Sequence, residues 1–313
     1  MKENPFEKVL MPVDRSEHSK RAVNFAGLML SNCETLPVVT LFYVMTGKHL
    51  SDFLKNIHLK ERDLKDYEFL KKSKEKHIRE FIEPFLNEYE NILKDAGFRG
   101  EINKKIEDGD PGSKIIKVAE DENFSTVIMA RRGMSELKSI LLGSVSSKVI
   151  YGLKNKNIYI VGQKLDMENQ CPIPYALIPV DGSVYSMKAL EHGVFLAKFV
   201  KGIKKFTILR VINISLYLER IRQGIDPEEE ANEILMKAKN SFLKAGIQDS
   251  LIETKIRVGV PAEEIVKDIE ENNYNLVIMG RKGRSALKDL VLGGVSYTVI
   301  NRCFEPVVAI INI

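Results

Sequence analysis

An internal repeat constrains this chain more than any other feature, because a chain that carries the same motifs twice in the same order folds as two similar units. The segment KVLMPVD at residues 8–14 returns as YALIPVD at 175–181. Near the end of each copy, TVIMARRG at 126–133 returns as LVIMGRKG at 276–283. The other matches keep this order: TLFYV at 40–44 with TILRV at 207–211, GDP at 109–111 with GVP at 259–261, and LLGSVS at 141–146 with VLGGVS at 291–296.

The length of the chain agrees with a duplication. Its 313 residues suffice for two domains of about 150 residues, each able to bury its own core. The segment 162–174 between the copies is polar and ends in the sequence CPIP, which is typical of a domain boundary. We therefore predict a first domain over residues 1–164 and a second over residues 172–313.

Each copy alternates short apolar runs with longer segments of helical periodicity. This alternation is typical of βαβ units around a buried parallel sheet. The sequence therefore predicts an α/β fold of two tandem domains, each a five-stranded parallel sheet with helices on both faces. The strands are expected near residues 8–14, 38–45, 101–107, 126–130 and 157–161 in the first copy, and near 175–181, 206–212, 252–258, 276–280 and 307–312 in the second.

A helix is expected after the first strand of each copy. Ser16 is placed to be the N-cap of this helix in the first copy, and the corresponding helix of the second copy is expected to begin near Ser183. The apolar face that would cover the sheet in the first copy consists of Ala22, Phe25, Ala26 and Met29.

Between its second and third strands the first copy is longer than the second and follows a helical pattern. We expect an extended helix or a helical hairpin here with an apolar stripe that faces the core, and a partner-docking arm is the alternative. The stripe consists of Leu54, Ile57, Leu64, Phe69, Ile78, Phe81 and Phe85.

Charge and cysteine content disfavour several classes of protein. The 47 basic and 43 acidic residues are interspersed and leave a formal charge of +4, so no nucleic-acid partner is expected. The three cysteines form no CxxC pair and the histidines form no cluster at metal-ligand spacing, so neither a disulfide framework nor a metal site is expected. The N-terminus lacks the apolar run of a signal peptide, and no stretch approaches the ~20 apolar residues of a membrane span. We therefore expect a cytoplasmic protein without a membrane partner.

Glycines follow the fourth strand of the second copy in a pattern that has a chemical use. The sequence GRKG at 280–283 is followed after nine residues by GGVS at 293–296, which opens an apolar helix. Glycines at the end of a strand let the backbone approach a phosphate, and the N–H groups at a helix N-terminus supply donors and a positive dipole end. Asp181 and the equivalent Asp14 emerge at the same edge of the sheet, where doubly wound folds bind ligands. This pattern predicts a phosphate site, to which the charge of Arg281 and Lys282 is expected to contribute.

These residues carry a family resemblance. The spacing G-x2-G-x9-G-(S/T), with an aspartate that closes the first strand, resembles the nucleotide-binding signature of ATP-binding universal stress proteins, and the resemblance covers nearly the whole chain, twice. It implies a Rossmann-like (adenine nucleotide alpha hydrolase-like) sheet of order 3-2-1-4-5, with ATP as the cofactor and Mg²⁺ on its phosphates. It also implies that the copies associate through their last strands as a pseudo-dimer, which can dimerise again. Carried over by position, it nominates Pro179, Asp181, Val211, Gly280, Arg281, Gly283, Gly293, Gly294, Val295 and Ser296 in the second copy, and Asp14, Val44, Gly133, Gly143, Ser144 and Ser146 in the first.

Both copies depart from the signature. The first has Ala130 where the opening glycine belongs, which adds a Cβ at that point. The second has Gly294 where a serine or threonine would offer a hydroxyl, although the backbone N–H and Ser296 remain. The loss of one phosphate hydrogen bond costs about 1 to 3 kcal/mol. We therefore expect the second copy to be the better nucleotide site.

Each nominated residue also has a structural interpretation, which the sequence leaves open. The glycines also suit tight turns, and Asp14 and Asp181 also suit helix caps or turn acceptors. Ser144 and Ser296 also suit helix caps. Pro179 also suits the shaping of a strand end.

Three functions are considered. The first is an ATP-binding stress-response protein, non-catalytic or weakly hydrolytic, whose occupancy changes a surface seen by partners. The second, favoured by Ala130 and Gly294, is an interaction scaffold that has lost its nucleotide. The third is an enzyme that activates a substrate with ATP. It is disfavoured because the chain has no Walker A lysine motif, Ser-Gly-Gly-x-Asp-Ser loop or HxGH element, and its five histidines form no catalytic set. No catalytic residue is therefore nominated.

Overall fold

The computed structural model describes residues 4–31, 33, 35–47, 67–132, 142–163, 171–283 and 292–312. In this part of the chain a ten-stranded sheet is the central element. Its strands are β1 (Lys8–Pro12), β2 (Val38–Met45), β3 (Ile102–Asp108), β4 (Thr126–Ala130), β5 (Asn157–Val161), β6 (Tyr175–Pro179), β7 (Lys205–Asn213), β8 (Ile252–Gly259), β9 (Leu276–Gly280) and β10 (Val307–Ile311).

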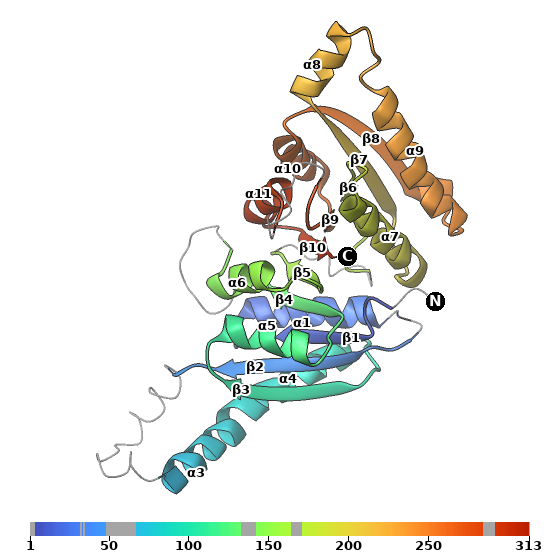
Figure 1. Ribbon diagram of the computed structural model, residues 1–313. Coiled ribbons are helices and arrows are strands. Elements are labelled where there is room, and N and C mark those ends of the chain that lie inside the picture. The colour runs from blue at the N-terminus through green and yellow to red at the C-terminus, as the bar shows by residue number, and fades with distance from the viewer. Residues whose placement is uncertain are drawn as a thin grey trace.

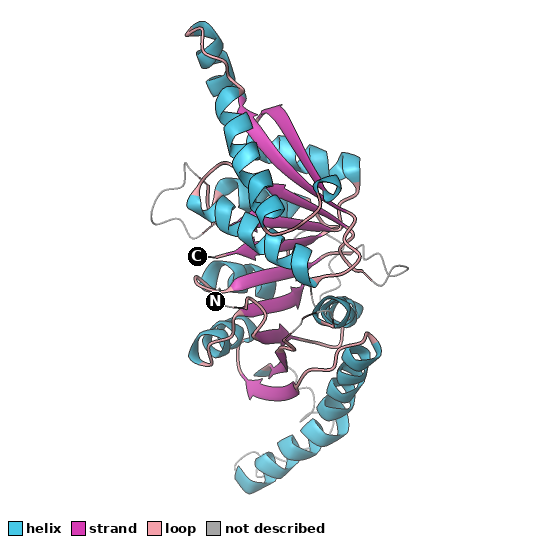
Figure 2. Cartoon of the chain, turned by 90° about the vertical axis from the view of Figure 1, so that its right-hand side faces the viewer, coloured by secondary structure: helices cyan, strands magenta, loops and turns pink. Residues whose placement is uncertain are grey.

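The order of the strands is β3-β2-β1-β4-β5-β10-β9-β6-β7-β8. Counted from its own first strand, each half therefore has the order 3-2-1-4-5. All pairs within a half are parallel, whereas β5 and β10 pair antiparallel, with Tyr159 opposite Ala309. We call this β5–β10 junction the seam. Figure 2 shows the strands stacked through the molecule as one continuous sheet.

Helices cover both faces of this sheet (Figure 1). One face is covered by α1 (Glu17–Leu30), α4 (Glu83–Asp95), α7 (Val184–Phe199) and α9 (Glu229–Lys244), and the other by α5 (Pro111–Asp121), α6 (Ser144–Gly152), α10 (Pro261–Asn272) and α11 (Gly294–Arg302). The helices α3 (Tyr67–His77) and α8 (Ile214–Arg222) lie at opposite ends of the molecule. Each face buries one apolar layer that includes residues of both copies, so the core is continuous across the seam. None of the helices in the described ranges has the length and apolar character that crossing a membrane requires.

The predicted α/β fold is confirmed, and the ten strands lie where the sequence places them, with ends displaced by at most two residues. The predicted N-cap at Ser16 is confirmed, and the second-copy helix begins where it was predicted, with Ser183 as its N-cap. The Oγ of Ser16 accepts the N–H of Ser19 at 3.1 Å, and the Oγ of Ser183 accepts the N–H of Ser186 at 3.2 Å. These caps are local, since each satisfies a donor of its own first turn.

The apolar stripe predicted for the longer segment of the first copy is only partly correct. Phe85 is buried, but Phe81 is 46% exposed. The reason is a π-helical turn at Ile78–Ile82 between α3 and α4. A π turn inserts an extra residue into the helix and so rotates the face that follows it. Leu54, Ile57 and Leu64, and the side chain of Phe69, lie outside the described residues.

A buried hydrogen bond crosses the seam within an aromatic cluster. The hydroxyl of Tyr159 in β5 lies 2.5 Å from Nε2 of His192 in α7. The ring of Phe6 packs against both, with centroid distances of 5.7 Å to Tyr159 and 5.6 Å to His192. Burial in this apolar layer lowers the pKa of His192 to about 3.

We expect His192 to make the stability of the chain depend on pH. The imidazole has an ordinary pKa of 6.5 when unfolded and about 3 when folded, so acid protonates the unfolded chain first. The stabilisation is therefore complete above about pH 6.5 and is lost as the pH falls towards 3. The free energy of unfolding is expected to fall by about 1 kcal/mol between about pH 7 and about pH 5.5 through this group. Urea unfolding of the wild type and of His192→Gln at several pH values measures this. The free energy of unfolding should depend more steeply on pH in the wild type, and an equal dependence in both would contradict the prediction.

Candidate functional site

A cavity of about 620 Å³ opens at the carboxyl ends of β6, β7 and β9 in the second copy. This is the edge of a doubly wound sheet at which ligands bind. Its lining includes every residue that the sequence nominated in the second copy except Arg281: Pro179, Asp181, Val211, Gly280, Gly283, Gly293, Gly294, Val295 and Ser296.

The first turn of α11 forms one wall of this cavity. The helix begins at Gly294, and no side chain caps it. The N–H groups of Gly294, Val295 and Ser296 have no acceptor within their helix, and none of the residues described in the structure accepts from them. The N–H of Gly293, in contrast, donates to the carbonyl of Arg281 at 2.9 Å and is used within the protein. Three backbone donors at a positive dipole end therefore face the cavity region.

The hydroxyls of Ser296 and Ser146 have a structural role. Ser296 donates to the carbonyl of Gly280 at 2.9 Å, and Ser146 donates to the carbonyl of Ala130 at 3.1 Å. Both side chains are buried. Each hydroxyl thus fastens the first turn of a helix to the end of the fourth strand of its copy.

Gly280 is required by packing between a helix and a strand. A Cβ at this position would lie 2.5 Å from the carbonyl carbon and oxygen of Tyr185 in α7. In the first copy Ala130 occupies the equivalent place in β4 and is buried there without a left-handed backbone. Position 280 is therefore limited by how closely the first helix approaches, and whether the Cβ of Ala130 weakens a phosphate site in the first copy stays a prediction.

The aspartates at the ends of the first strands act as turn acceptors. Oδ1 of Asp181 accepts the N–H of Ser183 at 2.9 Å, and Oδ1 of Asp14 accepts the N–H of Ser16 at 3.1 Å. Oδ2 of Asp181 also borders the glycine segment, since a Cβ at Gly283 would lie 2.8 Å from it. The turn interpretation is confirmed, and a contact with ligand stays a prediction.

The predicted contribution of Arg281 to the phosphate site is corrected by its position. Its side chain is 3% exposed and donates to the carbonyl of Ile150 at 2.5 Å, in the other copy. Burial lowers the pKa of Arg281 to about 10. Lys282, the next residue, does line the cavity. The two adjacent cations therefore face different parts of the molecule, Lys282 the cavity and Arg281 the seam.

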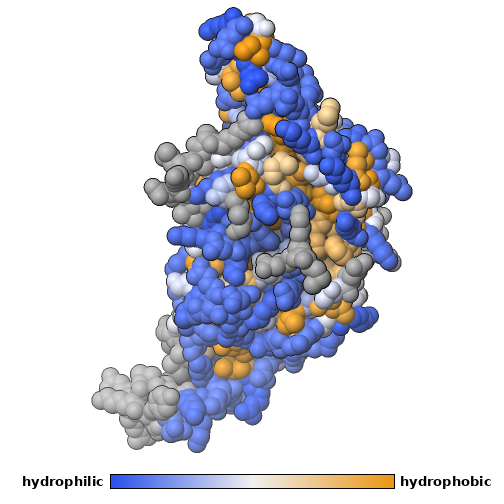
Figure 3. Space-filling view, turned by 45° about the vertical axis from the view of Figure 1, so that its right-hand side comes forward, coloured by the Kyte–Doolittle hydropathy of each residue, from blue (hydrophilic) through white to orange (hydrophobic). Residues whose placement is uncertain are grey.

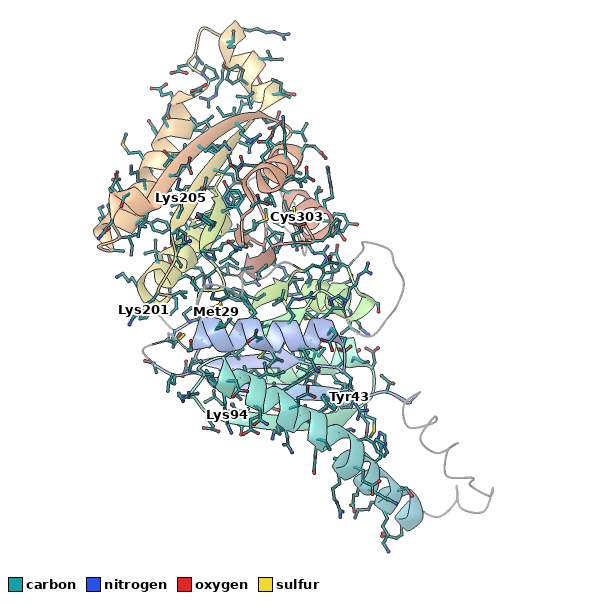
Figure 4. The ribbon with its side chains drawn as sticks, turned by 180° about the vertical axis from the view of Figure 1, so that it is seen from behind. Met29, Tyr43, Lys94, Lys201, Lys205 and Cys303 are labelled. Atoms are coloured by element: carbon teal, nitrogen blue, oxygen red, sulfur yellow. The ribbon has the colours of Figure 1, made fainter. Side chains whose placement is uncertain are left out.

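The first copy has a smaller cavity of about 160 Å³ at the equivalent edge. Asp14, Val44 and Ser146 line it, together with Ala130 and Arg132. Tyr43, which also lines it, lies near the end of β2 and is labelled in Figure 4.

Two nominations in the first copy lie outside its cavity, and a third is not among the described residues. Gly143 is the N-cap of α6 and Ser144 is its first residue, and neither lines the cavity. Gly133 lies outside the described residues. The chain therefore places fewer nominated residues around a cavity in its first copy than in its second.

The sequence analysis missed the outer wall of the larger cavity. This wall comes from the start of α10 and from the start of α8, through Val260, Pro261, Ala262 and Ile265 and through Asn213 and Leu216. The repeated GVP turn at 259–261 is the signal that indicated the α10 contribution. The contribution of α8 had no counterpart among the matched motifs.

Within the described ranges, no group of three or more His, Cys, Asp or Glu side chains is arranged to hold a metal ion. The five histidines include His192, which is buried at the seam and away from both cavities.

Comparison with known proteins identifies the family. The universal stress protein family matches the chain twice, over residues 5–154 and 176–310, and the chain belongs to this family. The resemblance drawn from the glycine spacing is therefore confirmed at the level of the family.

Individual relatives match one copy or both. Universal stress proteins MJ0531 and MJ0577 of Methanocaldococcus jannaschii are 30% identical over 140 residues and 33% identical over 153 residues. Each alignment covers 43% of this chain, and they cover 79% and 92% of those proteins respectively. The crystal structure of a universal stress protein from Archaeoglobus fulgidus DSM 4304 is similar over 98% of both chains, with 25% identity and a TM-score of 0.65.

Proposed function

We propose that this chain is an adenine-nucleotide-binding protein of the stress response whose second copy holds ATP, without catalysis or with weak hydrolysis, in the cytoplasm. The observation that carries the proposal is the cavity of about 620 Å³ with the first turn of α11 in its wall. Ligand cavities span about 300 to 1,000 Å³. The cavity of about 160 Å³ in the first copy falls below that range, so we assign the nucleotide to the second copy.

The lining of the cavity divides into two kinds of surface. Val211, Ile265 and Met279 give it an apolar side, which suits a purine ring. The N–H groups of Gly294 and Ser296, with the ammonium of Lys282, give the other side positive potential, which suits phosphates. An adenine nucleotide has these two chemical ends in one molecule.

The fit also has a steric basis. A Cβ at Gly294 would meet no atom of the described residues within 4 Å, so these residues leave the surface in front of the first turn of α11 open. When bound, the phosphates would bring Mg²⁺, whose preferred ligands are the oxygens of phosphates, carboxylates and water. The residues named above would orient the nucleotide and exclude water from its base.

We further propose that residues 1–164 and 172–313 act together as an internal pseudo-dimer, which associates again as a homodimer. The antiparallel pairing of β5 with β10 supports the first part. The alternative function is a nucleotide-free interaction scaffold of the same family. The open surface at Gly294 favours the nucleotide, since a scaffold has no need of it.

A bulky residue at Gly283 separates the two functions. Among the described residues, the nearest atom to a Cβ there is the carboxylate end of Asp181, which can move, so Gly283→Ile is expected to fold. Under the proposal it weakens binding of Mg·ATP by at least about tenfold, because the side chain occupies the glycine segment of the cavity. Calorimetry of the full chain, together with assay of nucleotide released on denaturation, measures this. Equal binding by the wild type and the variant, or no nucleotide by either method, would overturn the proposal.

A further inference from the structure

Two buried arginines cross the seam in opposite directions. Arg131 of the first copy is 4% exposed and donates to the carbonyls of Cys303, at 3.1 Å, and of Ile300. Arg281 of the second copy occupies the equivalent position and donates to the carbonyl of Ile150. These carbonyls belong to the last turns of α11 and α6, and Figure 4 labels Cys303 just beyond the end of α11. Each arginine therefore holds the C-terminus of a helix of the other copy, where a cation is favoured.

The opposite ends of the same two helices border the two cavities. The first turn of α11 lines the larger cavity through Gly294 and Ser296, and the first turn of α6 lines the smaller one through Val145 and Ser146. Each helix has nine residues, a length of about 13 Å. Arg131 thus holds the far end of the helix that forms a wall of the second-copy cavity.

The backbone of each arginine is hydrogen-bonded to the N-cap of the helix whose first turn lines the cavity of its own copy. The carbonyl of Arg131 accepts the N–H of Gly143 at 3.1 Å, and the carbonyl of Arg281 accepts the N–H of Gly293 at 2.9 Å. Gly143 and Gly293 are the N-caps of α6 and α11. These contacts form a closed circuit. From Gly293 it follows α11 to the side chain of Arg131, whose carbonyl accepts from Gly143. It then follows α6 to the side chain of Arg281, whose carbonyl accepts from Gly293.

Stability alone does not account for this circuit. Burial lowers the pKa of Arg131 to about 10, and its Nε finds no hydrogen-bond partner among the described residues. Burying a charge without a carboxylate is unfavourable, and replacing buried ionic groups by apolar residues of similar volume is often neutral or stabilising. Carbonyls at a helix end bind the guanidinium only while that helix keeps its position, so each arginine responds to a displacement of the helix that it holds.

We propose that this circuit couples the two cavities, so that a nucleotide bound against the first turn of α11 stabilises the backbone around Arg131 and the first turn of α6 in the other copy. The proposal rests on the assignment of the nucleotide to the second copy. Coupling between two sites requires a structural element whose position is influenced by both of them. Here α11 and α6 are these elements.

Hydrogen exchange of the full chain with and without Mg·ATP tests the coupling. In the wild type, nucleotide should slow exchange at residues 293–297 and also, by at least about fivefold, at residues 142–147. In Arg131→Met the second effect should disappear while the first remains. Arg302→Met is the matched control, because Arg302 is an exposed arginine on the last turn of α11 that pairs with Glu263. It should behave as the wild type does.

The outcomes separate the coupling from the proposed function. If calorimetry shows binding but nucleotide slows hydrogen exchange only at residues 293–297, the coupling is wrong and the nucleotide site is still supported. Protection at 142–147 that survives in Arg131→Met would overturn the circuit. Arg131→Lys, which keeps the charge but loses the fork of donors, replaces Arg131→Met if that variant does not fold, and the same loss is expected. No binding by calorimetry and no protection anywhere would contradict the nucleotide site itself, and the coupling with it.

Discussion

Replacing Gly294 by glutamate is expected to weaken the binding of Mg·ATP by at least about 100-fold and to leave the fold as stable as the wild type or more stable. A side chain fits at this position, since a Cβ there meets no atom within 4 Å in the part of the chain that the structure describes. Gly294 is the first residue of α11, where a carboxylate stabilises a helix by about 0.3 to 1 kcal/mol. The same carboxylate repels phosphates that bind at this helix end. Calorimetry and thermal unfolding of the same sample measure the two effects, which have opposite signs.

A second glutamate serves as the control for net charge. Val184 is the first residue of α7, is 65% exposed and does not line the cavity. Val184→Glu therefore places the same charge at another helix N-terminus without entering the site. If both variants weakened binding equally, or if Gly294→Glu bound nucleotide normally, the phosphates would not lie at the first turn of α11.

Gly280→Ala is expected to lower the free energy of unfolding by about 3 kcal/mol. The added methyl group would lie 2.5 Å from the carbonyl group of Tyr185, and backbone atoms of a packed helix cannot move aside as the end of a side chain can. Either α7 or β9 must shift, and both belong to the buried layer of the second copy. Urea unfolding at neutral pH measures the loss.

The reverse substitution in the first copy is the matched control. Ala130→Gly removes a methyl group from the equivalent strand position and should cost about 1 kcal/mol, through a small cavity and a more flexible unfolded chain. An equal effect of both substitutions would show that α7 does not govern position 280. A loss of nucleotide binding in Gly280→Ala without any loss of stability would assign that glycine to the phosphates instead.

Much of the fold was predictable because the signals are local. The strands are short apolar runs and the caps at Ser16 and Ser183 act on their own first turns, so neither depends on distant contacts. The exposure of Phe81, which the apolar pattern did not predict, is in contrast associated with a contact that is distant in the sequence. The apolar spacing there suits a regular helix, and the π turn at Ile78–Ile82 is accompanied by a hydrogen bond from Arg15 to the carbonyl of Phe81, a partner far away in the sequence.

The candidate site was predictable as a location but not in the roles of its residues. Strand ends and the glycine spacing indicate the edge of the sheet at which the larger cavity opens. Whether a glycine is needed for packing, as at Gly280, or leaves open space, as at Gly294, depends on what lies opposite it. The same limit applies to Arg281, because a motif does not say which of two adjacent cations faces the seam. The wall contributed by α8 required the folded chain, since no matched motif marked it.

The two copies have unequal cavities on one sheet. The larger cavity has Lys282 and a glycine at the start of its helix, whereas the smaller has Arg132 beside Ala130. The seam has kept its symmetry better than the cavities, since Arg131 and Arg281 make equivalent contacts with opposite copies. This combination suits a molecule in which one copy binds ligand and the other responds to it.

A crystal structure of the full chain grown with Mg²⁺ and a non-hydrolysable ATP analogue is the most direct test of the nucleotide assignment. The account predicts one analogue per chain in the second copy, with phosphate oxygens within about 3 Å of the amide nitrogens of Gly294, Val295 or Ser296. Density for the analogue away from the first turn of α11, or a cavity that holds only water at saturating analogue, would contradict it.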